Sequence, residues 1–190
     1  MKQYLAIDIG ASSGRHIVGR LVGGKLETEE VYRFPNGNVQ QDGYLVWDAE
    51  RLFCEVKKGI AAAVAKCGKI DSLSIDTWGV DYVLMQGDKE IFPCYAYRDG
   101  RTERAVKEVH AILPFEKLYE RTGIQFQSFN TVYQLYADKL AGRLEKADGF
   151  LMLPEYLLYK LTGKRVCEYT NATSTGLVNA KTHTFDADII

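Results

Sequence analysis

Apolar and polar positions are arranged most regularly near the start of the chain, where two short apolar runs flank a polar turn. Residues 4–7 and 17–21 carry mostly apolar side chains, a pattern that favours two strands. The residues between them, Asp8 to Arg15, are small or polar and include Gly10 and Gly14. The pattern predicts a β-hairpin with an acidic residue at the start of its turn.

The remainder of the first half predicts a mixed α/β fold. Apolar residues recur at helical spacing after a capping aspartate, and a further apolar run follows that helix. Because a helix connects it to the hairpin, the strand in that run is expected to lie parallel to the first strand. The expected elements are strands at 4–7, 17–21 and 26–34, a loop at 35–43, a helix from Asp48 to Gly68 and a strand around 73–75.

The second half predicts mainly helices, and the length of 190 residues suits one domain. Glycine and proline mark the expected ends of the elements. The expected elements are a hairpin at 80–85 and 91–94, helices from Thr102 to Pro114, at 115–122, from Thr131 to Leu144 and from Pro154 to Gly163, and a strand-like remainder from Lys164.

Composition narrows the classes of partner. The net charge is -1, and the 24 basic residues are dispersed, which argues against a nucleic-acid surface or a polybasic membrane anchor. The apolar run before Asp8 is too short for a signal peptide, and no run approaches a membrane span. We therefore expect a cytoplasmic protein that binds small molecules.

The cysteines and histidines do not suggest a metal site. They are scattered along the chain without Cys-x-x-Cys spacing, so buried free thiols and solvated imidazoles are expected. The residues concerned are Cys54, Cys67, Cys94, Cys167, His16, His110 and His183.

The hairpin turn has the composition of an anion-binding turn. Gly10 and Gly14 lack the Cβ atoms that would keep a ligand from the backbone, and the residues between them are small, so successive N–H groups can face a phosphate. Asp8 could hold a hydrated Mg2+, and Arg15 could neutralise phosphate charge. The turn has neither the Walker pattern nor the dinucleotide pattern. The alternative is an ordinary surface turn.

A second polar segment, Asp76 to Asp81, follows the strand around 73–75, at the kind of strand end where open α/β sheets bind ligands. Asp76 and Asp81 could accept hydrogen bonds from sugar hydroxyls. Trp78 could cover an apolar sugar face, and Gly79 would allow a close approach to the backbone. The alternative is a structural turn with Trp78 in the core. Together the two segments suggest phosphoryl transfer to a small hydroxylated substrate.

Residues 8–15, DIGASSGR, resemble the phosphate hairpin of the FGGY carbohydrate kinases, within the actin, Hsp70 and hexokinase superfamily. Longer stretches are similar to those members of the family that phosphorylate L-rhamnulose, and the similarity covers essentially the whole chain in the family's order. These stretches are residues 75–81, 96–99, 123–126, 129–131, 133–135, 153–156 and 168–173.

The resemblance implies a ribonuclease-H-like α/β domain over residues 1–190, with a mixed sheet flanked by helices and with cap insertions. It implies transfer of the γ-phosphoryl group of ATP to the 1-hydroxyl of L-rhamnulose, in L-rhamnose catabolism, with Mg2+ held by Asp8. The expected ATP-binding residues are Asp8, Ala11, Ser12, Ser13, Gly14 and Arg15. The expected sugar-binding residues are Asp76, Trp78, Gly79, Asp81, Arg98 and Asn130.

One part of the family pattern is not found in the chain. The family's catalytic aspartate and its adenosine site belong to a second domain that would follow Ile190. No general base is therefore expected within residues 1–190, the C-terminal domain is an expected partner, and the chain alone should turn over ATP poorly. Two alternatives stay open, a kinase for another ketose such as xylulose or fuculose, and a non-catalytic domain that binds sugar or nucleotide.

Overall fold

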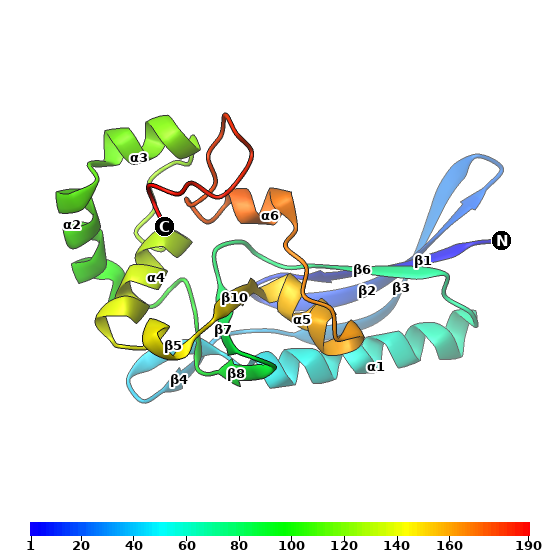
Figure 1. Ribbon diagram of the computed structural model, residues 1–190. Helices are drawn as coiled ribbons and strands as arrows, with labels where there is room; N and C mark the ends of the chain where they lie inside the picture. The colour runs from blue at the N-terminus through cyan, green and yellow to red at the C-terminus, as the bar shows by residue number, and fades with distance from the viewer. The chain divides into compact units, whose positions relative to one another are not determined.

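The computed structural model describes all residues from 1 to 190 (Figure 1). The chain divides into two compact units. The first unit comprises residues 1–39, 47–78 and 153–165, and the second comprises residues 40–46, 79–152 and 166–190.

The first unit contains a four-stranded sheet in the order β3-β2-β1-β6, formed by β1 (Gln3–Ile9), β2 (Ser13–Val22), β3 (Lys25–Pro35) and β6 (Ser72–Asp76). Strand β1 is antiparallel to β2 and parallel to β6, as predicted. The predicted turn from Asp8 to Arg15 is too long, because β1 and β2 pair as far as Ile9 and Gly14. Only residues 10–12 lie outside the strands.

Two helices pack on this sheet. Helix α1 (Ala49–Cys67) begins after Asp48, whose carboxylate accepts a hydrogen bond from the backbone N–H of Arg51, and ends at Gly68 as predicted. Its buried residues, among them Leu52 and Val56, face β2 and β3. Helix α5 (Leu153–Thr162) contacts both α1 and β6, so the two helices cover one face of the sheet (Figure 1).

Burial differs from the prediction at one histidine and two cysteines. His16 of β2 is fully buried under α1, where Gly59 leaves room for the imidazole, so the prediction of a solvated ring is wrong. Burial lowers the pKa of His16 below its ordinary value. All four cysteines are free, but Cys54 and Cys167 are exposed rather than buried.

The second unit contains two small sheets. One has the order β10-β7-β8, from β7 (Tyr82–Gln86), β8 (Lys89–Ile91) and β10 (Gly149–Met152), and it includes the predicted hairpin. The other has the order β4-β5-β9, from β4 (Val39–Gln41), β5 (Tyr44–Trp47) and β9 (Cys94–Tyr95), and its terminal residues Val39 and Trp47 are grouped with the first unit. Strand β4 replaces part of the loop predicted at 35–43.

The helices of the second unit surround a core that includes Val109, Leu118 and Tyr133. The predicted helix at 115–122 is confirmed. The predicted helix from Thr131 ends at Leu140 instead of Leu144. The segment from Lys164, which was predicted to be strand-like, includes a short helix. The elements are η1 (Gly100–Thr102), α2 (Glu103–Ile112), α3 (Phe115–Thr122), α4 (Thr131–Leu140), η2 (Leu144–Lys146) and α6 (Tyr169–Thr173). None of the helices in the structure is both long and apolar enough to span a lipid bilayer.

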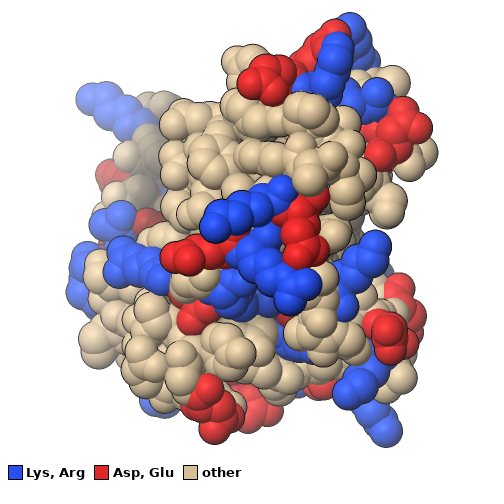
Figure 2. Space-filling view, turned by 90° about the vertical axis from the view of Figure 1, so that its left-hand side faces the viewer, with Lys and Arg blue, Asp and Glu red and all other residues tan.

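Charges of both signs share the face that carries α2 and α3 (Figure 2). Basic and acidic side chains lie next to one another there, as in the ion pairs between Arg104 and Glu108 and between Lys117 and Glu120. This face therefore has no extended patch of a single sign.

Candidate functional site

The turn between β1 and β2 presents two unused backbone donors. No hydrogen bond within the chain involves the N–H groups of Ala11 or Ser12. The two carbonyl groups of the turn at Gly10 and Ser12 face the other way, since they accept hydrogen bonds from the side chain and the backbone N–H of Asn36, at 2.8 and 2.9 Å. Free adjacent N–H groups on a fixed turn are suited to bind an anion.

Gly14 serves packing rather than access to the backbone. A Cβ atom at this position would lie 2.2 Å from Cζ of Phe34, so the ring of Phe34 occupies the space that the missing side chain leaves. A Cβ at Gly10 would lie 3.3 Å from the carbonyl oxygen of Ser13, which also accepts the N–H of Gly10 at 2.8 Å. Both glycines therefore allow the turn to close tightly.

Asp8 and Asp76 lie side by side at the carboxyl ends of two parallel strands. They are register partners on β1 and β6, and Arg15 is the register partner of Asp8 on β2. Oδ2 of Asp8 accepts a hydrogen bond from Nε of Arg15 at 2.8 Å and forms an ion pair with Nη2 of Arg15, also at 2.8 Å. Asp8 and Arg15 are each close to half exposed, which leaves both within reach of solvent or a ligand.

The carboxylates of Asp8 and Asp76 fit a hydrated magnesium ion. Mg2+ commonly takes one or two carboxylates and completes its octahedral coordination with water and substrate phosphates. No group of three or more His, Cys, Asp or Glu residues is placed to hold a metal by itself. A magnesium ion here would need ligands from a bound nucleotide.

Trp78, the last residue of the first unit before the chain enters the second, packs against another indole. Its ring centroid lies 4.1 Å from that of Trp47, which is 3% exposed. Trp78 itself is only partly buried. Trp78 therefore packs against a buried ring but keeps an accessible part, so it is not a fully buried core residue.

In the second unit, the segment of Gly79 to Asp81 has an unusual backbone. Val80 has a φ angle of 69°, a left-handed conformation that a β-branched residue rarely adopts. A Cβ at Gly79 would lie 2.9 Å from Oγ of Ser174, so Gly79 allows the chain to pass close to the end of α6. This close approach gives Gly79 a structural role that the sequence did not reveal.

The remaining predicted sugar-binding residues differ in their access to solvent. The side chain of Asp81 is fully buried, and its two oxygens accept hydrogen bonds from Gln134 Nε2 and from the backbone N–H of Tyr97. Asn130 is 7% exposed and donates to the carbonyl oxygen of Gln125 at 2.9 Å. Arg98 is exposed, with Nε 3.2 Å from the hydroxyl of Tyr97.

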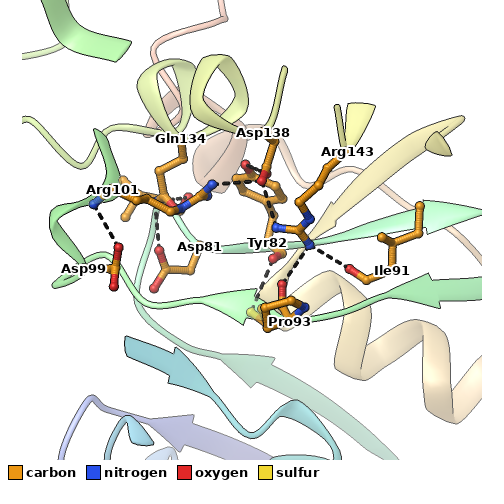
Figure 3. A network of polar contacts seen from close by, with 11 residues as sticks. Asp81, Tyr82, Ile91, Pro93, Asp99, Arg101, Gln134, Asp138 and Arg143 are labelled. Carbon is orange, nitrogen blue, oxygen red and sulfur yellow. Dashed lines mark hydrogen bonds and ion pairs between the residues drawn. The ribbon is translucent and has the colours of Figure 1, made fainter. Parts of the chain in front are cut away.

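A buried polar network surrounds Asp81 and contains residues that the sequence analysis did not select (Figure 3). Asp138 is fully buried and accepts hydrogen bonds from Nη1 of Arg101 and of Arg143, both at 2.8 Å, and from the hydroxyl of Tyr82. Burial and the Asp138 carboxylate raise the pKa of Tyr82 well above its ordinary value, so this hydroxyl stays a donor. Neither local periodicity nor a motif distinguishes these residues from surface charges.

The chain belongs to the FGGY family of carbohydrate kinases: residues 3–190 match the N-terminal domain of that family. The rhamnulokinase of Oceanobacillus iheyensis is 50% identical over 189 residues, which is 98% of this chain and 40% of that protein. The rhamnulokinase of Bacillus subtilis is 42% identical over 189 residues, covering 98% of this chain and 39% of that protein. The chain thus spans about two fifths of the length of these curated relatives.

Solved structures of sugar kinases share the fold. Gluconate kinase from Lactobacillus acidophilus has a TM-score of 0.86 at 22% identity, over 99% of this chain and 39% of that one. Plasmodium falciparum glycerol kinase, solved with ADP, has a TM-score of 0.76 at 18% identity, over 100% of this chain and 40% of that one. This likeness confirms the predicted fold, a mixed α/β domain with a sheet flanked by helices.

Proposed function

We propose that the chain serves in the transfer of the γ-phosphoryl group of ATP to the 1-hydroxyl of L-rhamnulose, a step in L-rhamnose catabolism. The observation that carries this proposal is the 50% identity to a rhamnulokinase over 98% of the chain. Seven relatives with 41 to 50% identity bear the name rhamnulokinase, which favours this ketose over xylulose or fuculose.

In this proposal the hairpin turn binds the nucleotide. The free N–H groups of Ala11 and Ser12 donate to phosphate oxygens, and Ser13 and Gly14 hold the turn in place. Arg15 neutralises phosphate charge, and Asp8 contributes a ligand to Mg2+. A loose phosphoryl-transfer transition state requires mainly such positioning and charge neutralisation.

The predicted sugar-binding residues are proposed to bind the sugar. Arg98 and Trp78 retain exposed surface for this purpose, Asp76 is exposed, and Gly79 offers its backbone. Asp81 and Asn130 are buried, and their contribution to the sugar site is therefore proposed to be indirect. The rival reading of a non-catalytic domain that binds sugar or nucleotide is tested by the experiments below.

The general base is proposed to lie in a C-terminal domain, in the part of the relatives' length that this chain does not match. The carboxylates at strand ends are assigned other roles: Asp8 and Asp76 are proposed as ligands of magnesium, and Asp76 also orients the sugar. Accordingly, the 190-residue chain by itself should turn over ATP poorly, even if it binds substrates. We also propose that the reaction takes place in the cytoplasm, where ATP is available.

Amide hydrogen exchange with and without MgADP tests the nucleotide site. The proposal predicts slower exchange at residues 8–15 when MgADP is present, and loss of that protection in Arg15→Ala. A chain whose residues 8–15 exchange equally fast with and without MgADP would contradict the nucleotide role. Robust ATP-dependent phosphorylation of L-rhamnulose by this chain alone would contradict the assignment of the base to a further domain.

A further inference from the structure

Gln134 of α4 is 2% exposed and its side chain contacts several segments of the second unit. Its Nε2 lies 2.9 Å from Oδ1 of Asp81 and 3.0 Å from the carbonyl oxygen of Phe129. The same nitrogen lies 3.2 Å from the carbonyl oxygen of Val80. One side-chain amide therefore connects the segment that follows Gly79 with the residue before Asn130.

The orientation of this amide is set by the charges on either side of it (Figure 3). Oε1 of Gln134 lies 3.3 Å from Nη2 of Arg101, and a guanidinium can only donate. Nε2 lies beside the carboxylate of Asp81, and a carboxylate can only accept. Arg101 is itself fixed by its ion pair with the buried Asp138, 2.8 Å away.

The backbone beside Gly79 is held in a strained conformation by α4. Val80 has a φ angle of 69°, which costs free energy for a β-branched residue and persists only where the surroundings enforce it. Its carbonyl oxygen accepts hydrogen bonds from Oγ1 of Thr131, at 2.8 Å, and from Gln134. The two α4 side chains thus fix the peptide between Val80 and Asp81, whose N–H donates to the carbonyl oxygen of Gly79 at 3.0 Å.

Asp81 extends the same connection to the loop that carries Arg98. Its Oδ1 accepts from Gln134, and its Oδ2 accepts the backbone N–H of Tyr97 at 3.1 Å. The ring of Tyr97 in turn lies 5.3 Å from that of Phe129, centroid to centroid. Three segments that carry proposed sugar-binding residues are therefore bonded to one buried pair, Asp81 and Gln134.

We propose that Gln134, acting with Asp81, is a positioning residue for the sugar: it sets the backbone of Gly79 and the loop of Arg98 without touching substrate. This inference rests on the proposed function and deepens it, since it assigns specificity for a ketose to contacts beneath the site. A buried pair of this kind holds separate loops in one fixed arrangement before the sugar binds. Less conformational entropy is then lost on binding.

The test compares Gln134→Met with Thr122→Val. Methionine keeps the length of glutamine without its hydrogen bonds. Thr122→Val removes two other hydrogen bonds, from Oγ1 of Thr122 to the carbonyl oxygen of Leu118 and from the N–H of Ile124 to the same Oγ1, and leaves the network intact. Calorimetric titration with L-rhamnulose should show binding weakened by roughly tenfold or more in Gln134→Met, and by less than about twofold in Thr122→Val.

Residue-resolved hydrogen exchange without ligand supplies the second readout. In Gln134→Met, exchange of the Tyr97 amide should rise by about tenfold, because the carboxylate that accepts it is released. The same amide should be unchanged in Thr122→Val. Wild-type affinity in Gln134→Met, or an unchanged Tyr97 amide, overturns the positioning role and leaves the proposed function standing. If the wild-type chain does not bind L-rhamnulose, the proposed substrate is contradicted, and exchange at Tyr97 alone decides the positioning role.

Discussion

Asp8 and Asp76 are register partners on the parallel strands β1 and β6, at the ends where the chain leaves the sheet. Two carboxylates on neighbouring strands repel each other unless a cation or a donor lies between them. Arg15 contacts Asp8 from β2, on the side away from β6, with both contacts at 2.8 Å, so it does not lie between the two carboxylates. The pair is thus suited to a magnesium ion that arrives with a nucleotide.

Substitution of either carboxylate should weaken binding of the magnesium complex specifically. We expect Asp8→Asn and Asp76→Asn each to lower MgADP affinity by roughly tenfold or more, because each removes a charged oxygen ligand of the metal. Calorimetric titrations with MgADP, and with ADP in the presence of EDTA, measure this difference.

The matched control is Glu27→Gln, which removes an exposed carboxylate from β3 of the same sheet. It should leave MgADP affinity unchanged. An equal loss with ADP in EDTA would show that Asp8 and Asp76 act on the nucleotide or on the fold, and not through magnesium.

Gly14→Ala should destabilise the chain through the ring of Phe34. The added Cβ would lie 2.2 Å from Cζ of that ring, so the ring must move from its packed position. Overpacking of this kind costs about 1–3 kcal/mol of the free energy of unfolding. Urea unfolding of the variant measures the loss.

Gly19→Ala on the same strand provides the comparison. The nearest atom to its added Cβ, Cδ1 of Leu26, lies at 3.5 Å, which is ordinary contact. Its free energy of unfolding should change by less than about 1 kcal/mol. Equal losses in the two variants would contradict the role assigned to Phe34.

Stability should depend on pH near neutrality through His16. Burial lowers the pKa of His16 in the folded chain below the ordinary value of 6.5. The unfolded chain therefore binds a proton first as the pH falls below 6.5, and the free energy of unfolding decreases until the pH reaches the folded pKa. Unfolding measured from roughly pH 8 down to pH 5 should show this slope. His16→Gln should flatten it, and an unchanged slope would contradict the assignment.

A second pH dependence is expected in acid. Asp186 is 3% exposed and accepts hydrogen bonds from Nε and Nη2 of Arg121, at 2.8 and 2.7 Å. The bonds from Arg121 lower the pKa of Asp186 from 3.8 to about 2. The stability that this pair contributes is complete above pH 3.8 and is lost as the pH falls through about 2. In urea unfolding, Asp186→Asn should remove this acid-dependent loss of the free energy of unfolding. Asp188→Asn, at an exposed position, should retain most of it.

The sequence predicted the hairpin, the long helix and the parallel strand because each has a local signal: apolar runs, a capping aspartate and a terminal glycine. Such signals do not determine how far two strands pair toward their turn. Asp8 and Arg15 belong to the strands because they pair across the sheet. A polar pair beside a turn lacks the alternation of apolar residues that would predict a strand there. The close contact of Phe34 with Gly14 is likewise a tertiary feature.

The buried network was beyond prediction for a related reason. From the sequence alone, a glutamine or an arginine in a helical or polar segment is expected to be solvated. Gln134 and Arg101 are interior because α4 contacts η1 and the segment before β7. Helix α6 was missed because its five residues include tyrosine and threonines, which favour strands. Its N-cap, Glu168, accepts two backbone N–H groups and offsets that preference.

The most direct test of the central claim is a titration of the chain with L-rhamnulose, followed by tryptophan fluorescence and repeated with D-xylulose and with Trp78→Phe. Trp47 and Trp78 are the only two tryptophans, and the variant leaves Trp47, which is 3% exposed. We predict a saturable change with L-rhamnulose at concentrations where D-xylulose gives little, and loss of most of that change in Trp78→Phe. Equal responses to both ketoses, or no response to L-rhamnulose, would contradict the assignment of this chain to the binding of L-rhamnulose.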